Sequence, residues 1–114
     1  MVGELAQQEF TFTGIEHTCE PRPHHPLGKL ALDAVRTGEA GPVAEAGLFA
    51  ADRLDHSHSL IRPLLEAGNL VICDRNVHSS LVYQGLVGGV GLEEVSRMNS
   101  AAMLPDLVLW IDCD

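Results

Sequence analysis

Two short apolar runs constrain the fold of this chain more than any other feature of its sequence. "LVICD" (70–74) and "DLVLWIDCD" (106–114) consist largely of apolar, β-branched or aromatic residues. Runs of this kind are typical of strands that are buried on both faces of a parallel sheet. Helical patterns lie between the expected strands, and strands that alternate with helices predict an α/β domain around a parallel sheet.

The first half of the chain carries a weaker strand and a clear helix. A strand is expected at residues 14–19, and it should end where Pro21 removes a backbone donor. Residues 25–38 space their apolar side chains as an amphipathic helix does, and Gly38 provides a stop signal. We therefore expect strand, loop and helix in that order.

Two further helical segments are predicted. Residues 42–67 form a long helical pattern that opens with Pro42, and Pro63 inside it should kink the helix or divide it in two. A last helix is indicated by the spacing of Leu92, Val95, Met98 and Met103. The whole chain, residues 1–114, is expected to form a single domain.

Composition excludes several functions. The formal net charge of -9 opposes non-specific binding to nucleic acid and to anionic membranes. No apolar run is long enough to span a bilayer, and we find no signal-peptide pattern, so we expect a soluble cytoplasmic protein without a membrane or nucleic-acid partner. The three cysteines have no paired spacing and are expected to be reduced and buried: Cys19, Cys73 and Cys113.

Charged residues follow the expected strand at 70–74. Ligands of parallel α/β sheets gather beyond the carboxyl ends of the strands, where Asp74 and Arg75 are found. An acid there can bind magnesium or accept a proton, and the adjacent arginine can hold a phosphate. The alternative is an ordinary surface ion pair at the end of a strand.

Two more patterns are compatible with a nucleotide. Phe49 and Arg53 are four residues apart and share one helix face, where a ring could stack on a base beside a guanidinium, although a core position for Phe49 and an ion pair for Arg53 are alternatives. "VHSSLVYQG" (77–85) offers hydroxyl and amide groups that can read a base edge, or serines that merely cap a helix.

Histidines suggest a separate metal hypothesis. A structural or regulatory zinc ion would accept ligands of this type, but no C-x-x-C or H-E-x-x-H spacing is present, and exposed loop histidines are the alternative. The residues concerned are His17, Cys19, His24 and His25, with His56 and His58 as a second group.

Several motifs in order resemble the thymidylate kinase family. They are "TCEP", "LFAADR", "IRPLLEAGNLVICDRN", "SSLVYQG" and "PDLVLWID", within residues 16–114. The resemblance implies part of a P-loop nucleoside-monophosphate-kinase-like parallel sheet flanked by helices. It also implies transfer of the γ-phosphoryl group of ATP to dTMP, with Mg²⁺ as cofactor, which gives dTDP for dTTP synthesis.

The resemblance also assigns roles to residues. Phe49 would stack on thymine, and Arg53 would contact the base or its phosphate. Arg75 would hold the acceptor phosphate, while Asp74 would lie near the Mg²⁺ ion and the reacting phosphates, so that Asp74 and Arg75 are the expected catalytic pair. The residues expected to read the thymine edge and crowd the sugar are Ser79, Ser80 and Gln84.

Departures from the family pattern accompany these matches. Glu20 falls in the strand-end motif beside the pocket, but Cys19 replaces the motif's arginine, and Arg22 is a candidate substitute for the lost phosphate contact. Asn76 replaces the tyrosine after D-R. No G-x-x-x-x-G-K-[ST] motif is present, and the family's lid and last helices are also missing. Residues 1–14 resemble the end of the helix that follows the P-loop.

Three hypotheses follow. In the first, the chain is an incomplete thymidylate kinase that supplies the dTMP side of the site and is inactive alone, with ATP bound only if the missing portion is supplied. In the second, the chain is a non-catalytic nucleotide-binding module or half of a split kinase. The third hypothesis is a related deoxynucleoside kinase. A homodimer through the 42–67 helix is also expected.

Overall fold

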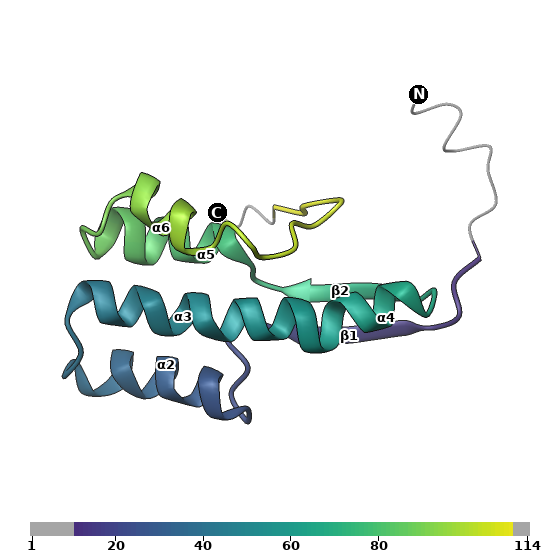
Figure 1. Ribbon diagram of the computed structural model, residues 1–114, viewed down its shortest axis with the longest axis horizontal. Helices are drawn as coiled ribbons and strands as arrows, with labels where there is room; N and C mark the ends of the chain where they lie inside the picture. Colours follow the sequence, from purple (N-terminus) through teal and green to yellow (C-terminus); the bar gives the residue numbers. More distant parts are fainter. Residues whose placement is uncertain (1–10, 111–114) are drawn as a thin grey trace.

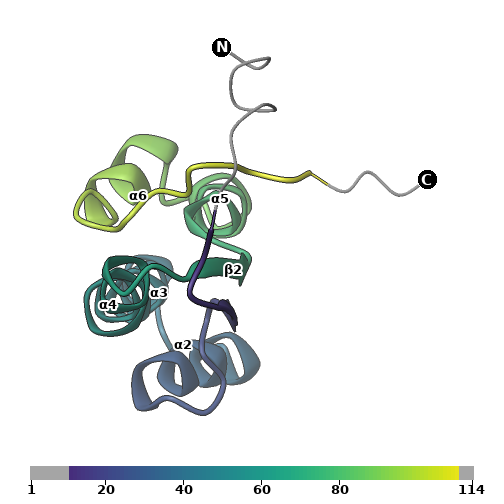
Figure 2. The same cartoon turned by 90° about the vertical axis from the view of Figure 1, so that its right-hand side faces the viewer.

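The structure, a computed structural model, describes residues 11–110 and contains a short parallel sheet. Strand β1 (Ile15–Cys19) pairs in parallel with β2 (Leu70–Asp74), and Cys19 lies opposite Asp74 at the carboxyl ends. Helices α3 (Pro42–His56) and α4 (Arg62–Glu66) run along one face of the sheet (Figures 1 and 2). The predicted strands at 14–19 and 70–74 and the α/β class are confirmed.

Helix α2 (Pro26–Thr37) forms where the sequence predicts it. The His25 ring accepts a hydrogen bond from the backbone N–H of Leu27 at the start of the helix. At its end Gly38 takes a φ of 68° and donates to the carbonyl of Ala34, a conformation that favours glycine. Within α2, Gly28 is required because a Cβ there would lie 1.9 Å from the backbone oxygen of Arg22.

The long helical stretch predicted at 42–67 is helical without a break from Pro42 to Glu66, and its hydrogen-bond pattern widens just before Pro63 instead of kinking there. Helix α3 continues through a wide π-helical turn, η1 (Ser57–Ile61), into α4. The backbone N–H of Arg62 bonds to the carbonyl of Ser57, five residues earlier. Pro63 then falls in the first turn of α4, where its missing N–H is tolerated. The two segments remain roughly in line (Figure 1).

The helices that follow β2 pack on the other side of α3 from α2. They are α5 (Val77–Ser80), the π-helical segment η2 (Leu81–Val87) and α6 (Leu92–Met98). Figures 1 and 2 show α3 between α2 and the α5–α6 pair. Helix α6 is shorter than predicted and does not reach Met103, because the chain leaves helical conformation at Asn99.

Two expectations about strands are wrong. In β2 exposed and half-buried residues alternate, and Ile72 is 46% exposed, because only one face of the two-stranded sheet is covered by helices. The expected strand at 106–114 is absent from its described part: residues 107–110 pair with neither strand, and Trp110 is 83% exposed. Apolar sequence alone does not make a strand without a neighbour that accepts its backbone hydrogen bonds. The helix end expected within residues 1–14 is not present at residues 11–14, which are irregular. Residues 1–10 and residues 111–114, with Cys113, lie outside the described part.

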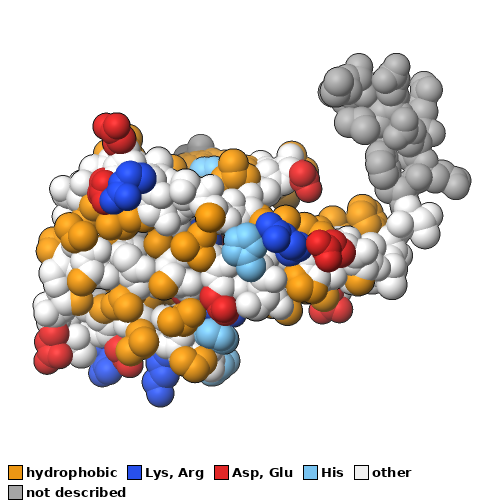
Figure 3. Space-filling model, viewed as in Figure 1, with side chains coloured by type: hydrophobic (Ala, Val, Ile, Leu, Met, Phe, Trp, Pro, Cys, Tyr) orange, Lys and Arg blue, Asp and Glu red, His pale blue; other side chains and the backbone are white. Residues whose placement is uncertain are grey.

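Apolar burial is modest. Seven apolar residues are fully enclosed within the described part: Ala31, Ala34, Ala46, Ala50, Ile61, Val77 and Val95. Larger apolar side chains remain on the surface, and Figure 3 shows them over the side of the molecule formed by α2 and α3, with charged groups between them. No described helix is long and apolar enough to cross a bilayer.

Candidate nucleotide-binding site

A pocket of about 550 Å³ opens beyond the carboxyl ends of the two strands. Helices α2 and α3 form one wall, and α5 with η2 forms the other. Seven of the nine predicted site residues line it: Glu20, Phe49, Arg53, Arg75, Ser79, Ser80 and Gln84. Apolar and aromatic wall residues that the sequence did not suggest are Leu32, Val35, Tyr83 and Val87.

Arg53 is the most constrained cation in the pocket wall. It is 2% exposed, and its Nε donates to Glu20 Oε1 at 2.7 Å. Its Nη1 donates to Ser80 Oγ at 2.9 Å and to Asn99 Oδ1 at 2.7 Å, and its Nη2 donates to the carbonyl of Asn76 at 3.3 Å. A guanidinium has five N–H groups. Four are therefore used within the described residues, and one on Nη2 is not.

Glu20 connects Arg53 to a buried histidine. Its second oxygen, Oε2, accepts a hydrogen bond from His56 Nδ1 at 2.7 Å, and the other ring nitrogen of His56 lies 2.6 Å from the Thr18 hydroxyl. His56 is 0% exposed and Glu20 3%. These side chains thus tie the end of β1 to α3, with Glu20 and His56 buried and Thr18 half-buried.

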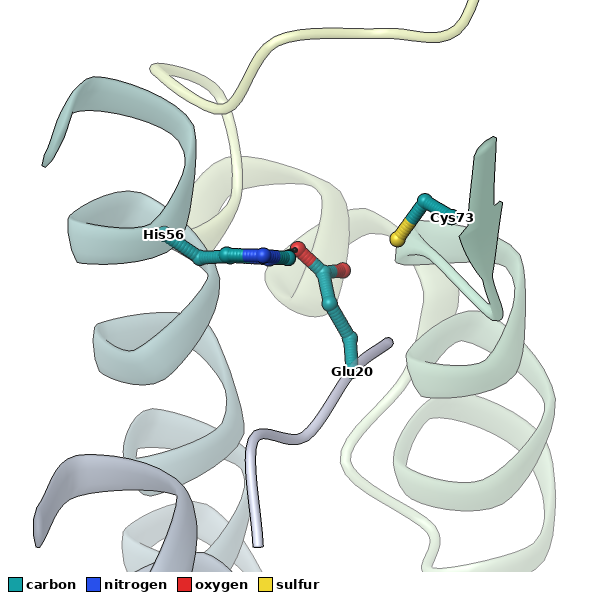
Figure 4. A group of neighbouring side chains, drawn as sticks. All are labelled: Glu20, His56 and Cys73. Atoms are coloured by element: carbon teal, nitrogen blue, oxygen red, sulfur yellow. Dashed lines mark hydrogen bonds and ion pairs between the residues drawn. The ribbon is translucent and has the colours of Figure 1, made fainter. Parts of the chain in front are cut away.

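Cys73 approaches this pair from β2, as Figure 4 shows. Side-chain ligand atoms of Glu20, His56 and Cys73 lie within 4.8 Å of one another, the only such group in the part of the chain that the structure describes. Burial and the Glu20 charge raise the pKa of the Cys73 thiol to about 12. Glu20 and His56 are hydrogen-bonded to each other, whereas the Cys73 thiol donates to the carbonyl of Arg75 at 3.1 Å.

The histidine groups of the metal hypothesis are not brought together. Among the described residues, His17, Cys19, His24 and His25 form no cluster with metal-ligand spacing. His25 instead caps α2, and His58 contacts the carbonyl of Ala101. Cys19 and Cys73 are free thiols and half-buried rather than fully buried.

Asp74 and Arg75 occupy different positions at the end of β2. Arg75 lines the pocket and has a φ of 68°, which is uncommon for a residue with a side chain. Unfavourable backbone conformations are often found at functional sites. Asp74 is exposed beside the pocket and is not part of its lining.

Arg22 lies outside the pocket lining. Its Nε donates to Asp52 at 2.8 Å and its Nη2 to Asp55 at 2.9 Å, which ties the loop after β1 to α3. The pKa of Asp55 is lowered, first by the hydrogen bond from Arg22 and then by that from Ser59. The guanidinium is therefore shared between two acids.

Sequence reasoning did not place two residues of the buried network beside the pocket, and it named one of them, His56, only as a candidate zinc ligand. His56 carried a signal, because it follows Arg53 by three residues and so shares its helix face. Asn99 carried none, since 46 residues separate it from Arg53.

Comparison with known proteins agrees with these observations. The model of the family described as thymidylate kinase matches residues 3–114. The chain belongs to the thymidylate kinase family. Membership confirms the P-loop nucleoside-monophosphate-kinase-like fold.

Individual thymidylate kinases show the extent of the similarity. The chain is 41% identical over 90 residues to thymidylate kinase of Synechococcus sp. (75% of this chain, 44% of the relative), and 47% over 89 residues to that of Desulfovibrio desulfuricans (75% and 41%). The crystal structure of thymidylate kinase from Ehrlichia chaffeensis superposes with a TM-score of 0.71 at 28% identity, covering 88% of this chain and 58% of that one. The chain spans less than half the length of these curated relatives.

Proposed function

We propose that the described residues form the dTMP-binding half of a thymidylate kinase site, which would receive the γ-phosphoryl group of ATP on dTMP and release dTDP. The observation that carries the proposal is the pocket at the strand ends. It gathers Phe49, Arg75, Ser79 and Gln84 from three separate segments beside the buried Arg53.

The chemistry of the pocket suits a pyrimidine monophosphate. Phe49 offers a ring for stacking, and Gln84 with Ser79 offers donors and acceptors for the base edge. Arg75 lies at the strand end, where a charge-assisted hydrogen bond can hold the phosphate. Arg53 supplies its remaining N–H to the base or to its phosphate.

Phosphoryl transfer depends mainly on positioning and on neutralising charge. We assign Asp74 to the neighbourhood of a Mg²⁺ ion, because a carboxylate oxygen is a suitable ligand and Asp74 is exposed next to Arg75. Bound Mg²⁺ would neutralise the transferring phosphates. The sequence holds no G-x-x-x-x-G-K-[ST] loop to hold ATP, so we propose that these 114 residues alone bind dTMP without phosphorylating it.

Ligand-dependent thermal stabilisation tests the proposal. A ligand that binds the folded state adds about 2.7 kcal/mol of stability at roughly 100 times its Kd. We expect a Tm increase with dTMP and a smaller one with thymidine, which lacks the phosphate. An equal or larger increase with thymidine would favour a deoxynucleoside kinase.

A matched pair of arginine variants locates the binding site. R75A should weaken dTMP binding about 10- to 100-fold, since a hydrogen bond to a charged group contributes about 1.5–3 kcal/mol. R36A removes another exposed arginine, at the end of α2, and should leave Kd unchanged. Equal affinities of R75A and R36A, measured by titration calorimetry, would refute the assignment.

We also propose a cytoplasmic location and a homodimer through residues 42–67. The acidic charge and family membership support the location. Exposed apolar side chains support the dimer, for example Val43, Leu60 and Leu65. Sedimentation equilibrium of the chain and of V43E tests it: a dimer that persists in V43E with unchanged affinity would place the interface elsewhere.

A further inference from the structure

The unused N–H of Arg53 depends on how Glu20 is held. A carboxylate beside a guanidinium commonly accepts two parallel hydrogen bonds, from Nε and from a neighbouring Nη. Glu20 accepts one bond from Arg53, through Oε1, while its Oε2 accepts a bond from His56. The histidine thus holds toward itself the oxygen that would complete the second contact.

We propose that His56 is a positioning residue that keeps Glu20 singly bonded to Arg53 and so reserves an Nη2 N–H of Arg53 for the nucleotide. The proposal rests on the proposed function, because it assumes that Arg53 contacts dTMP. His56 would act through Glu20 and would not touch the ligand.

The surroundings of the three side chains favour this role. The backbone N–H of Glu20 bonds to the carbonyl of Asp74. This bond extends the strand pairing and fixes the backbone position from which the Glu20 side chain extends. Thr18 Oγ1 holds the far side of the His56 ring. Both ring nitrogens of His56 therefore have a partner. Glu20 cannot turn toward solvent because Glu20 and His56 are both buried.

Loss of the donor at His56 leaves a buried carboxylate oxygen without a partner. Such an oxygen is costly to leave unsatisfied, and Arg53, which already donates to Oε1, has a further N–H on Nη2 to offer. Glu20 would then bind Arg53 through both oxygens and draw Nη2 away from the pocket. The nucleotide would lose a hydrogen bond even though every pocket residue is unchanged.

Two substitutions of His56 distinguish the roles of its two ring nitrogens. In H56N the amide nitrogen can take the place of Nδ1 and still donate to Glu20. In H56Q the longer side chain can reach Thr18 in place of Nε2, but it leaves Oε2 of Glu20 without its donor. T18V is the matched control, since it removes the hydroxyl near Nε2 and retains the His56–Glu20 bond.

Kd for dTMP and the free energy of unfolding are measured for all four proteins. We expect H56N and T18V to bind dTMP within about 3-fold of the unmodified chain, and H56Q to bind about 10-fold more weakly, the equivalent of one hydrogen bond. Equal weakening in H56N and H56Q, or weakening in T18V that matches H56Q, would overturn the inference. If the unmodified chain does not bind dTMP, the proposed function itself fails and this inference with it.

An NMR measurement on the unmodified chain decides the matter if H56Q does not fold. The inference requires a proton on Nδ1 of His56, which a long-range ¹H–¹⁵N spectrum detects directly. A neutral ring with its proton on Nε2 alone would overturn it, because Nδ1 could not donate to Glu20.

Discussion

Two arginines that contact the same helix are held by acids in different ways. Arg22 is shared between Asp52 and Asp55, so two carboxylates face this one guanidinium. Arg53 faces one acid, Glu20, and otherwise the neutral groups of Ser80, Asn99 and Asn76. The difference indicates that an anionic ligand is favoured near Arg53, with Arg75 beside it, and opposed near Arg22.

The largest expected effect is that of R53M. The substitution leaves Glu20 buried without its cationic partner, which costs about 3–5 kcal/mol of stability, and it removes the ligand contact. We expect dTMP binding to be lost. Urea unfolding and titration calorimetry measure the two effects.

R22M is the matched control for this prediction. It should also lower stability, because Asp52 is buried, but dTMP affinity should change by less than about 3-fold since Arg22 lies outside the pocket lining. A loss of dTMP binding in R22M as large as that in R53M would contradict the distinction between the two arginines. It would support the hypothesis that Arg22 contacts the phosphate.

G28A tests whether the loop that carries Arg22 is fixed by packing. The new Cβ would meet the Arg22 backbone oxygen at 1.9 Å, and overpacking of this kind costs about 1–3 kcal/mol. G47A is the control, because a Cβ at Gly47 meets nothing within 4 Å and alanine favours a helix by up to about 1 kcal/mol. Denaturant unfolding should therefore give opposite signs. A neutral G28A would mean that α2 and the loop separate easily.

These comparisons also indicate what the sequence alone could and could not predict. The boundaries of α2 were predictable because its signals are local, namely an apolar period and the stop at Gly38. The residues of the pocket were predictable because their motifs occur in the order in which the thymidylate kinase family has them. Asn99 was not, since its bond to Arg53 depends on how α6 packs on α3.

The wrong predictions share one cause. Residues 70–74 and 106–110 were expected to be buried or paired because they are apolar, but burial depends on which neighbours cover a segment. In the described part the sheet has two strands, so one face of β2 and the side chain of Trp110 are exposed. The composition of a segment predicts whether burial is favourable for it. It does not predict whether another strand or helix is there to cover it.

A smaller effect is expected from pH at the Arg22 cluster. The pKa of Asp55 is below its ordinary value of 3.8 in the folded state, chiefly because Arg22 donates to it. A group whose pKa is depressed by folding adds stability above its unfolded pKa and loses it as pH falls through the folded pKa. The contribution of Asp55 should therefore be constant from pH 7 to about 5 and decline below about pH 4.

D55N isolates that contribution. The free-energy difference between the unmodified chain and D55N, measured by urea unfolding from pH 3 to 7, should shrink at the acidic end and stay level above pH 5. D33N is the control, because Asp33 is an exposed acid that pairs with Arg36 on α2. A difference that grows on acidification would contradict the assigned direction.

The smallest effect concerns the thiol beside the Arg53 network. Burial first, and the negative charge of Glu20 second, raise the pKa of Cys73 to about 12, so the thiol stays protonated at pH 8. The thiolate is the reactive form, and alkylation of Cys73 by iodoacetamide should therefore be slow in the folded chain and fast in urea. Mass spectrometry of the Cys73 peptide measures both rates.

In H56Q the alkylation rate of Cys73 reports on the position of Glu20. If the Glu20 carboxylate turns toward Arg53, its charge acts less on Cys73 and alkylation accelerates while the chain is still folded. An unchanged rate in a folded H56Q would mean that Glu20 stays in place without its histidine.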